Sequence, residues 1–209
     1  MPTIDLAFEL SATEIPLDYG YALFGAISRV VPSVHGDRRI GVHPIRGLKL
    51  ARGRLTLLPE SKLRLRLPSE EIAAYLPLAG AVLELDGTRL RVGIPRAEPL
   101  IPAPILGSRL VTIGHRKEPE EFLDSVNRQL TGLGILAAAT FPPSTDPTRS
   151  AEPPRRILRV KDRKIIGYAV RVTGLTAEES LLLQERGLGS RRRMGCGVFV
   201  RQGEGQFHA

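Results

Sequence analysis

Apolar and polar positions in the first hundred residues predict a half built of strands and two helices. Residues 3–9 alternate between apolar and polar side chains, as a strand does. In 18–31 the apolar side chains recur with the period of a helix, which Asp18 can cap. A second helix is predicted from Ser69 to the residue before Gly80. The remaining strands are predicted at 41–45, 52–58 and 62–67, and in a hairpin of 81–85 and 88–94.

The same order of elements recurs after a proline-rich segment. Pro95, Pro99, Pro102 and Pro104 predict a stiff linker, which we place at 98–107. Beyond it, a strand and a helix are followed by a hairpin, a second helix and a last strand. These elements are predicted at 109–114, 119–130, 156–161 with 164–172, 176–186 and 198–201, with a long mobile loop rich in Pro, Ser and Thr at 141–154.

Each half therefore has the order strand, helix, strand, strand, helix, strand. Thr176 and Glu179 have the spacing of a capping box for the last helix. The repeated order predicts an α+β chain of two tandem ferredoxin-like (RRM-like) domains, at 1–97 and 108–209. The two halves share the order of their elements and not their residues.

Composition agrees with a folded globular chain. Of the 209 residues, 42% are hydrophobic and 25% are charged, which is typical of globular domains. The single cysteine, Cys196, excludes an internal disulfide framework and a cysteine-based zinc site. No apolar run approaches the roughly 18 residues of a membrane span, and the N-terminus does not resemble a secretion signal. We therefore expect a cytoplasmic protein that does not act in a membrane.

The net charge points to a polyanionic partner. The chain has 30 basic and 22 acidic residues, a net charge of +8. Residues 151–209 contain 12 basic and 6 acidic residues, so they contribute +6 of this charge. The asymmetry favours nucleic acid bound by the C-terminal part. The alternative is a composition bias towards arginine, because a GC-rich genome also raises the basic charge.

A glycine- and arginine-rich loop at 187–197 is the most distinctive motif of the chain. Its main-chain amides and guanidinium groups could hold RNA phosphates, because glycine permits close backbone approach. The order helix, loop, strand differs from both the Walker loop and the dinucleotide fingerprint. The alternative is a helix C-cap followed by a solvated turn. The predicted RNA-binding residues of the loop are Gly187, Gly189, Ser190, Arg191, Arg192, Arg193, Gly195 and Gly197.

This loop carries a family resemblance. Two Gly-hydrophobic-Gly units separated by five residues, close to the C-terminus and before a last strand, resemble the signature of the repeat-associated mysterious protein (RAMP) superfamily. Within it, segments 40–47 and 187–199 resemble those of the myxobacterial-type CRISPR-associated endoribonucleases, which cut precursor CRISPR RNA in its repeats. The resemblance extends over essentially the whole chain.

The resemblance implies a function and partners. It implies cleavage within the stem-loop of a CRISPR repeat RNA, retention of the product, and assembly with other CRISPR-associated effector-complex subunits. Relatives that bind RNA without cutting it carry similar loops. The alternative is therefore a non-catalytic RNA-binding subunit of a CRISPR effector complex.

The chemistry available to an RNA-cleaving protein of this sequence is limited. Acidic residues are dispersed and form no cluster with histidine at ligand spacing, so we expect neither a metal site nor a cofactor. Metal-independent cleavage uses the 2′-hydroxyl of the RNA as nucleophile and leaves a 2′,3′-cyclic phosphate. It needs a base, an acid, and cations around the transition state. Histidine can supply either proton transfer at neutral pH.

Four histidines are candidates. His35 lies in a polar loop after the first helix, and the neighbouring Arg38 and Arg39 could stabilise transition-state charge. His43 is as compatible with a hydrogen-bonded structural role as with a catalytic one. His115 is compatible with an RNA contact or with a solvated position, and His208 lies in a glycine-rich tail. An exposed loop histidine without a role remains an equal alternative for His35.

The family resemblance favours His35. In the resembling family the catalytic histidine usually lies just after the first helix, and some members add a tyrosine within the helix and a lysine after the histidine. Ser28 falls where that tyrosine would be, and Tyr21 lies about two turns earlier. We therefore predict a histidine-plus-arginine site with Tyr19, Tyr21 or Ser28 as an auxiliary group and His43 in reserve.

RNA affinity is expected to come from phosphate contacts. With 6 Phe, 4 Tyr and no Trp, base stacking cannot be its main source. Basic stripes along the predicted strands are secondary candidates, although the ordinary polar face of a half-buried sheet explains any single stripe equally well. These stripes are Arg64 with Arg66, Arg89 with Arg91, and Arg155, Arg156 and Arg159 with Lys161.

Overall fold

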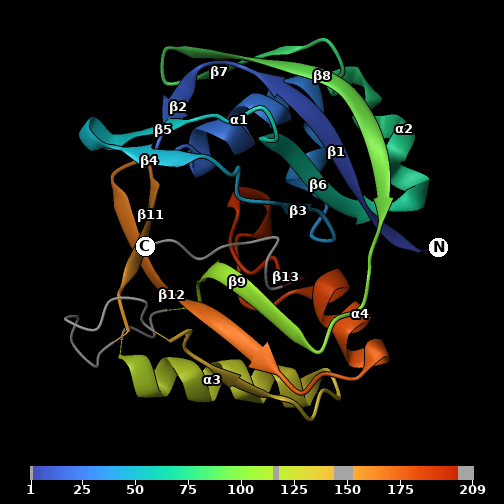
Figure 1. Ribbon diagram of the computed structural model, residues 1–209, viewed down its shortest axis with the longest axis vertical. Coiled ribbons are helices and arrows are strands. Elements are labelled where there is room, and N and C mark those ends of the chain that lie inside the picture. The colour runs from blue at the N-terminus through green and yellow to red at the C-terminus, as the bar shows by residue number, and fades with distance from the viewer. Residues whose placement is uncertain (1, 115–117, 144–152, 202–209) are drawn as a thin grey trace. The chain divides into compact units, whose positions relative to one another are not determined.

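The computed structural model describes residues 2–114, 118–143 and 153–201, so His115, His208 and most of the predicted loop at 141–154 lie outside the described residues (Figure 1). The chain divides into two compact units. The first comprises residues 1–100, 159–162 and 193–195, and the second comprises 101–158, 163–192 and 196–209. The chain passes from the first unit to the second at Leu100, and the glycine-rich loop contributes residues to both.

The first unit has a ferredoxin-like fold with one additional edge strand. Its five-stranded antiparallel sheet has the order β3-β6-β1-β8-β7. Without β7, this is the strand order of a split β-α-β fold, in which the second β-α-β unit interlocks with the first. The elements are β1 (Thr3–Ser11), α1 (Gly20–Val30), β3 (Gly41–Val42), β6 (Lys62–Pro68), α2 (Ile72–Tyr75), β7 (Val82–Leu85) and β8 (Thr88–Pro99).

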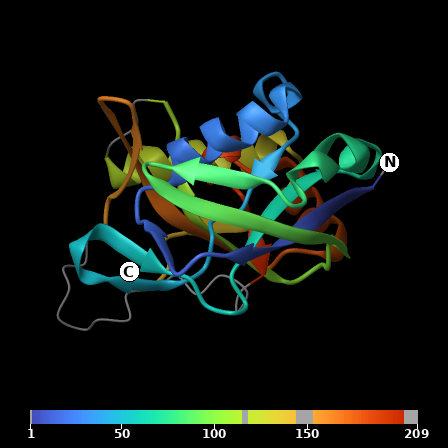
Figure 2. The same cartoon turned by 90° about the horizontal axis from the view of Figure 1, so that it is seen from above.

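Alternating side chains build the core of this unit. Leu63, Leu65 and Leu67 on β6 are fully buried, as the alternation predicts. Leu23 and Ile27 of α1 pack in the same core cluster, and the α2 region joins it. Figure 2 shows α1 and the α2 region on one side of the sheet strands.

A small second sheet was not expected from the sequence pattern. It has the strand order β2-β5-β4 and is visible in Figure 1 beside the main sheet of the first unit. Only β5 (Arg54–Thr56) was predicted, as part of a longer strand at 52–58. The other two strands are β2 (Glu14–Pro16) and β4 (Leu48–Leu50), which are too short to show a period in the sequence.

The predicted N-cap of the first helix was wrong. Helix α1 begins at Gly20 with Tyr19 at the N-cap position, without a side-chain cap. The Asp18 carboxylate lies instead 3.3 Å from Nε of Arg159, a residue of the same unit. A long-range ion pair thus replaces the local cap that the residue type suggested.

Two further predictions for this unit were wrong in part, one for the prolines of the expected linker and one for the second helix. Pro95 and Pro99, predicted as linker residues, belong to β8 and pair with Phe8 and Ile4 of β1. They are tolerated because β7 pairs only with the first residues of β8, which leaves an open edge along the rest of that strand. In the predicted helix at 69–79, by contrast, only α2 is α-helical. It is flanked by the 3-10 turns Ser69–Glu71 and Leu76–Leu78.

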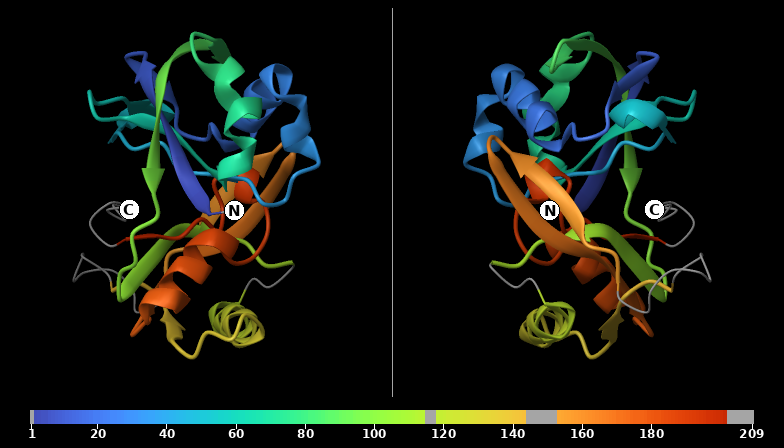
Figure 3. Two further views of the ribbon diagram at one scale, coloured as in Figure 1. Left: turned by 90° about the vertical axis from the view of Figure 1, so that its right-hand side faces the viewer. Right: turned by 90° about the vertical axis from the view of Figure 1, so that its left-hand side faces the viewer.

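The second unit has the plain ferredoxin-like strand order β10-β12-β9-β13, with β11 pairing to β12. Phe122, Val126 and Leu130 of α3 are buried, and the predicted Thr176–Glu179 capping box is present on α4. Both views in Figure 3 show α3 end-on, on the same side of the sheet strands as α4. The elements are β9 (Ile105–Val111), α3 (Pro119–Gly132), β10 (Ala138–Thr140), β11 (Arg156–Val160), β12 (Arg163–Thr173), α4 (Ala177–Arg186) and β13 (Val200–Arg201).

The prediction of an α+β chain with two tandem ferredoxin-like folds is confirmed. Among the described residues, none of the helices has both the length and the apolar character needed to cross a membrane.

Candidate functional site

His35 is presented at the surface of the first unit by a short turn after α1. Helix α1 ends at Val30, and Pro32 opens the 3-10 helix Pro32–His35. Proline is tolerated at the first position of such a turn because its missing N–H has no partner there. The side chain of His35 is exposed, and its ring meets the ring of Phe24 edge to face with 5.0 Å between the centroids. The imidazole ring of His35 thus packs on Phe24 on one side and is exposed elsewhere.

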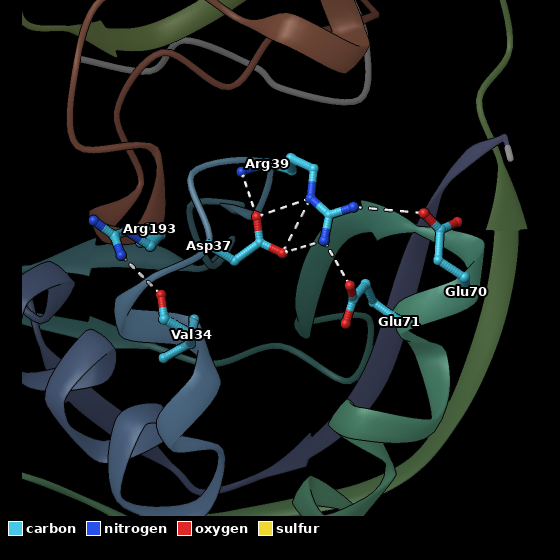
Figure 4. Close-up of polar contacts among 6 residues, drawn as sticks. All are labelled: Val34, Asp37, Arg39, Glu70, Glu71 and Arg193. Carbon is cyan, nitrogen blue, oxygen red and sulfur yellow. Dashed lines mark hydrogen bonds and ion pairs between the residues drawn. The ribbon is translucent and has the colours of Figure 1, made fainter.

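Arg193 lies beside this turn, in the part of the glycine-rich loop that belongs to the first unit. Its Nη1 donates to the carbonyl oxygens of Val34, at 2.8 Å, and of His35. The contact with Val34 is drawn in Figure 4. The guanidinium carbon lies 5.4 Å from the centroid of the Phe24 ring, within cation–π range. Arg193 therefore contacts protein groups around His35, which the sequence did not predict.

Arg39 is held by carboxylates rather than free beside His35. Its guanidinium contacts Asp37 at 2.7 Å, Glu71 at 2.5 Å and Glu70 at 3.5 Å, and Figure 4 shows it between the three. Hydrogen bonds from Arg39 lower the pKa of Asp37, and the positive charge of Arg193 adds to this effect. The expectation that Arg39 is available to stabilise transition-state charge is therefore not met in this structure.

Arg38 is the arginine of this pair that remains available. Its side chain is exposed. In the part of the chain that the structure describes, it forms no hydrogen bond or ion pair. Because Arg39 is ion-paired with carboxylates, Arg38 is the more available of the two arginines.

His43 has a buried structural position. Its side chain is 7% exposed, and Nε2 lies 3.1 Å from Oδ1 of Asp5. Arg66, which is 1% exposed, donates to both oxygens of Asp5 at 2.7 and 2.8 Å. Burial lowers the pKa of His43, and Nε2 donates to Asp5 because a carboxylate oxygen can only accept. Burial alone would raise the pKa of Asp5, but His43 and Arg66 hold it well below its usual range. This network holds His43 in the interior of the unit and explains Arg66, a predicted secondary RNA contact, as a core residue.

The predicted auxiliary hydroxyls of α1 are largely engaged inside the fold. Ser28 is buried and donates to the carbonyl of Phe24 at 2.7 Å. Tyr19 is buried too, and its hydroxyl donates to the carbonyl of Ile45 and accepts from the Ile45 amide. Tyr21 is half-buried on α1. Of the three, Tyr21 is the one for which the structure shows no such internal bond.

In the second unit, the glycine-rich loop is packed upon itself and upon its neighbours. The amides of Leu188 and Ser190 donate to the carbonyls of Gly197 and Thr112, and the amide of Gly189 donates to the side chain of Gln129. The amides at 187, 196 and 197 likewise have main-chain acceptors. The expectation that these amides face a phosphate is therefore not met, because protein acceptors already occupy them.

The glycines of the loop are explained by this packing. Gly187, Gly189 and Gly197 all have positive φ, and a Cβ on any of them would overlap a main-chain carbonyl oxygen. Gly195 also has a φ of 86°, but a Cβ there would meet only the carbonyl of Val42, at 3.8 Å. Three of the four glycines are thus required by close backbone packing, and the fourth by its dihedral angle alone.

We expect Gly197→Ala to destabilise the protein more than Gly195→Ala. Both substitutions force alanine into the left-handed region, which costs about 1–2 kcal/mol. Only Gly197→Ala adds a clash, with the carbonyl of Leu188, worth about 1–3 kcal/mol more. Urea-induced unfolding of the two variants measures the difference. Equal midpoints for the two would contradict the packing explanation.

The other predicted RNA contacts are mostly exposed. Arg191 is exposed and its guanidinium donates to Ser190 Oγ at 2.8 Å, whereas Arg192 donates to the carbonyl of Glu185 at 2.7 Å. On and beside β11, Arg155, Arg159 and Lys161 are exposed and Arg156 is half-buried. Arg155 lies 3.6 Å from Glu118, and Arg159 pairs with Asp18 as described above.

The sequence reasoning missed several contact residues. Phe24 gave no signal beyond its place in an apolar helix, and Asp5 none beyond its place in an alternating strand. Gln129 and Thr112 support the glycine-rich loop from α3 and from the segment after β9. Within residues 2–114, 118–143 and 153–201, no three His, Cys, Asp or Glu side chains are grouped as ligands for a metal ion.

Two ferredoxin-like units and a glycine-rich loop before the last strand agree with the resemblance drawn from the sequence, and the comparisons identify the family. The sequence model of the family described as Cas6 Crispr matches residues 4–204, so the chain belongs to the Cas6 family. The CRISPR-associated endonuclease Cas6 of Myxococcus xanthus is 39% identical over 203 residues. The alignment covers 97% of this chain and 83% of that protein.

Solved structures share the fold. A Cas6-related protein from Pyrococcus furiosus superposes with a TM-score of 0.66 at 16% identity, covering 95% of this chain and 98% of that one. Thermus thermophilus Cse3, bound to an RNA representing a pre-cleavage complex, gives a TM-score of 0.51 at 17% identity, covering 96% and 98%. A RAMP protein described as binding different RNA substrates gives 0.64 at 16% identity, covering 94% and 98%.

Proposed function

We propose that this protein is an endoribonuclease that cleaves precursor CRISPR RNA within its repeat stem-loops. Membership of the Cas6 family and 39% identity to a CRISPR-associated endonuclease support the substrate class and the reaction. The observation that carries the site is the exposed ring of His35 on the turn after α1, because His43 is buried. His35 is therefore the proposed catalytic histidine.

The proposed chemistry is metal-independent transesterification. The 2′-oxygen of the nucleotide before the cut forms a bond to the adjacent phosphorus, and the bond from phosphorus to the 5′-oxygen of the next nucleotide breaks. The 2′-hydroxyl loses its proton to a base, and the 5′-oxygen gains a proton from an acid. The products are a 2′,3′-cyclic phosphate and a free 5′-hydroxyl. His35 supplies one of the two proton transfers, since an imidazole can act in either role.

Cations complete the proposed site. A pentacoordinate phosphorus transition state concentrates negative charge on its equatorial oxygens, which a preorganised guanidinium stabilises. Arg38 is the proposed cation because it is exposed and lies three positions from His35. Arg39 is proposed to act indirectly, by holding Asp37 and the loop between β3 and α1.

The proposed partner is a repeat RNA hairpin, which the protein retains after cleavage for transfer to other CRISPR-associated subunits. Exposed basic residues supply the phosphate contacts, since A-form RNA is recognised by its backbone and shape. Arg191, Arg155, Arg159 and Lys161 are the exposed members of the predicted set.

A cleavage assay with the cognate repeat RNA in EDTA tests the function. We expect a single cut in EDTA, a product that resists 3′-end labelling until the cyclic phosphate is opened and the resulting phosphate is removed, and no cut when the nucleotide before the cut carries a 2′-deoxyribose. Cleavage that requires an added divalent ion would contradict metal independence. Tight binding without any cut would favour the non-catalytic RNA-binding subunit.

Arg191→Ala tests the phosphate contacts. If Arg191 contacts one RNA phosphate, the slope of log affinity against log salt becomes shallower by about 0.7–0.9, because one fewer counterion is released. Arg186, whose side chain is 63% exposed at the end of α4, provides the control variant Arg186→Ala. Equal slopes for wild type and Arg191→Ala would remove Arg191 from the interface.

A further inference from the structure

We propose that Arg193 is a positioning residue that fixes the catalytic turn carrying His35, rather than a ligand of RNA phosphate. The proposal rests on the function proposed above, in which His35 transfers a proton. It concerns residues of the first unit only, to which Arg193, Met194 and Gly195 belong together with the turn.

The turn offers acceptors that its own amides do not use. Within the 3-10 helix Pro32–His35, the amide of Val34 donates to the carbonyl of Val31, and the amide of Gly36 to that of Ser33. The carbonyls of Val34 and His35 therefore lie at the C-terminal end of the turn, where carbonyl oxygens lack partners from the helix. One Nη1 of Arg193 donates to both. A cation is favoured at such an end, because the aligned carbonyls carry partial negative charge.

Phe24 links the same guanidinium to the imidazole ring. Arg193 stands over the face of Phe24 at 5.4 Å from its centroid, while the ring of His35 meets Phe24 at an interplanar angle of 69°. Phe24 is itself 7% exposed and fixed in α1. Arg193 thus holds the main chain of His35 directly, and it packs on the aromatic ring that orients the side chain.

The backbone around Arg193 is anchored, so the contact does not depend on a long side chain alone. Arg193 lies in the 3-10 turn Arg192–Met194, and Met194 packs against the hydrophobic core of the first unit. The side chain of Arg193 is half-buried, whereas that of Arg191 is exposed. Two neighbouring arginines of one motif are thereby assigned different tasks, Arg191 to the RNA and Arg193 to the turn.

The test measures cleavage rate and affinity separately. For Arg193→Ala we expect the single-turnover rate at saturating repeat RNA to fall on the order of 100-fold, because small displacements of a proton-transfer group have effects of that size. The salt slope of binding stays as in the wild type. Arg29→Ala is the matched control, since Arg29 of the same unit also donates to a main-chain carbonyl, that of Glu84, away from His35. We expect Arg29→Ala to keep the wild-type cleavage rate.

A rescue experiment distinguishes positioning from general destabilisation. Methylguanidinium added to Arg193→Ala should restore part of the rate, because it can occupy the vacated space and donate to the two carbonyls. It should not restore the rate of His35→Ala. The double variant His35→Ala, Arg193→Ala should be no slower than His35→Ala alone, since both substitutions remove the same contribution.

The outcomes separate this inference from the proposed function. If His35→Ala is inactive while Arg193→Ala cleaves at the wild-type rate, or if Arg193→Ala changes only the salt slope, the positioning role is overturned and the function stands. If the wild type does not cleave, the function fails, and nuclear magnetic resonance of the His35 ring still decides the geometry. Its ring-proton shifts move in Arg193→Ala and not in Arg29→Ala if Arg193 fixes the turn. Unchanged ring-proton shifts of His35 in both variants would overturn the positioning role of Arg193.

Discussion

His35→Ala should abolish most of the cleavage of repeat RNA while leaving the RNA bound. Removal of a proton-transfer group typically costs about 10²–10⁴-fold in rate. The affinity should stay close to that of the wild type, because the proposed phosphate contacts are made by basic residues and not by the imidazole ring. Single-turnover cleavage and a filter-binding titration with the same hairpin measure the two quantities.

Two control variants frame this result. Ser33 is exposed in the same 3-10 turn, so Ser33→Ala should keep the wild-type rate and show that the turn tolerates substitution. His43→Gln should lower stability and leave the rate per folded molecule unchanged, because His43 is buried against Asp5. Full activity of His35→Ala, together with loss of activity in His43→Gln at temperatures where it stays folded, would reverse the assignment.

Asp5→Ala should lower the free energy of unfolding by about 3–5 kcal/mol, the usual cost of leaving one partner of a buried ion pair uncompensated. Arg66 is 1% exposed, and both of its hydrogen bonds to Asp5 would be lost, as would that of His43. Urea-induced unfolding followed by circular dichroism measures the change.

The control is an ion pair of the same kind at the surface. Glu14 and Arg54 lie 2.8 Å apart in the small sheet with side chains 41% and 30% exposed, so Glu14→Ala should cost less than about 1 kcal/mol. Adding Arg66→Met to Asp5→Ala should recover part of the stability, since it removes the buried charge. If Asp5→Ala and Glu14→Ala cost the same, the network around His43 does not stabilise the core as described.

The fold was predictable because its signals are local. Each of the signals that predicted it lies within a few residues and appears in the structure at or near the expected place. These signals are the alternation in 62–67, the period of the two long helices, the Asp86-Gly87 turn and the Thr176–Glu179 capping box. The wrong predictions concern residues whose neighbours in the sequence indicated one structure while contacts with distant residues produced another. Asp18 has the chemistry of a cap but pairs with Arg159, and Pro95 and Pro99 indicate a linker but lie on an open strand edge.

The candidate site was predictable only in part, because only some of its signals lie within a few neighbouring residues. The place of His35 after the first helix can be found from the sequence, and the structure shows its ring exposed there. The glycine-rich loop was predicted as well, but the structure gives a different explanation for its glycines and amides. Four glycines around three arginines suggested amides facing a phosphate, and the structure shows those amides bonded to Thr112, Gln129 and the loop itself.

The amino-acid sequence by itself determined the order of the longer helices and strands, the two ferredoxin-like halves, and the position of an imidazole at the end of a helix, because periodicity and turn residues act over a few neighbours. Only the tertiary structure decided which polar groups remain available. Asp5 meets Arg66 across 61 positions, and Arg193 meets His35 across 158. Such pairs form when strands and loops distant in the chain come together, and the resulting burial separates His35, which is exposed, from His43, which is held in the core.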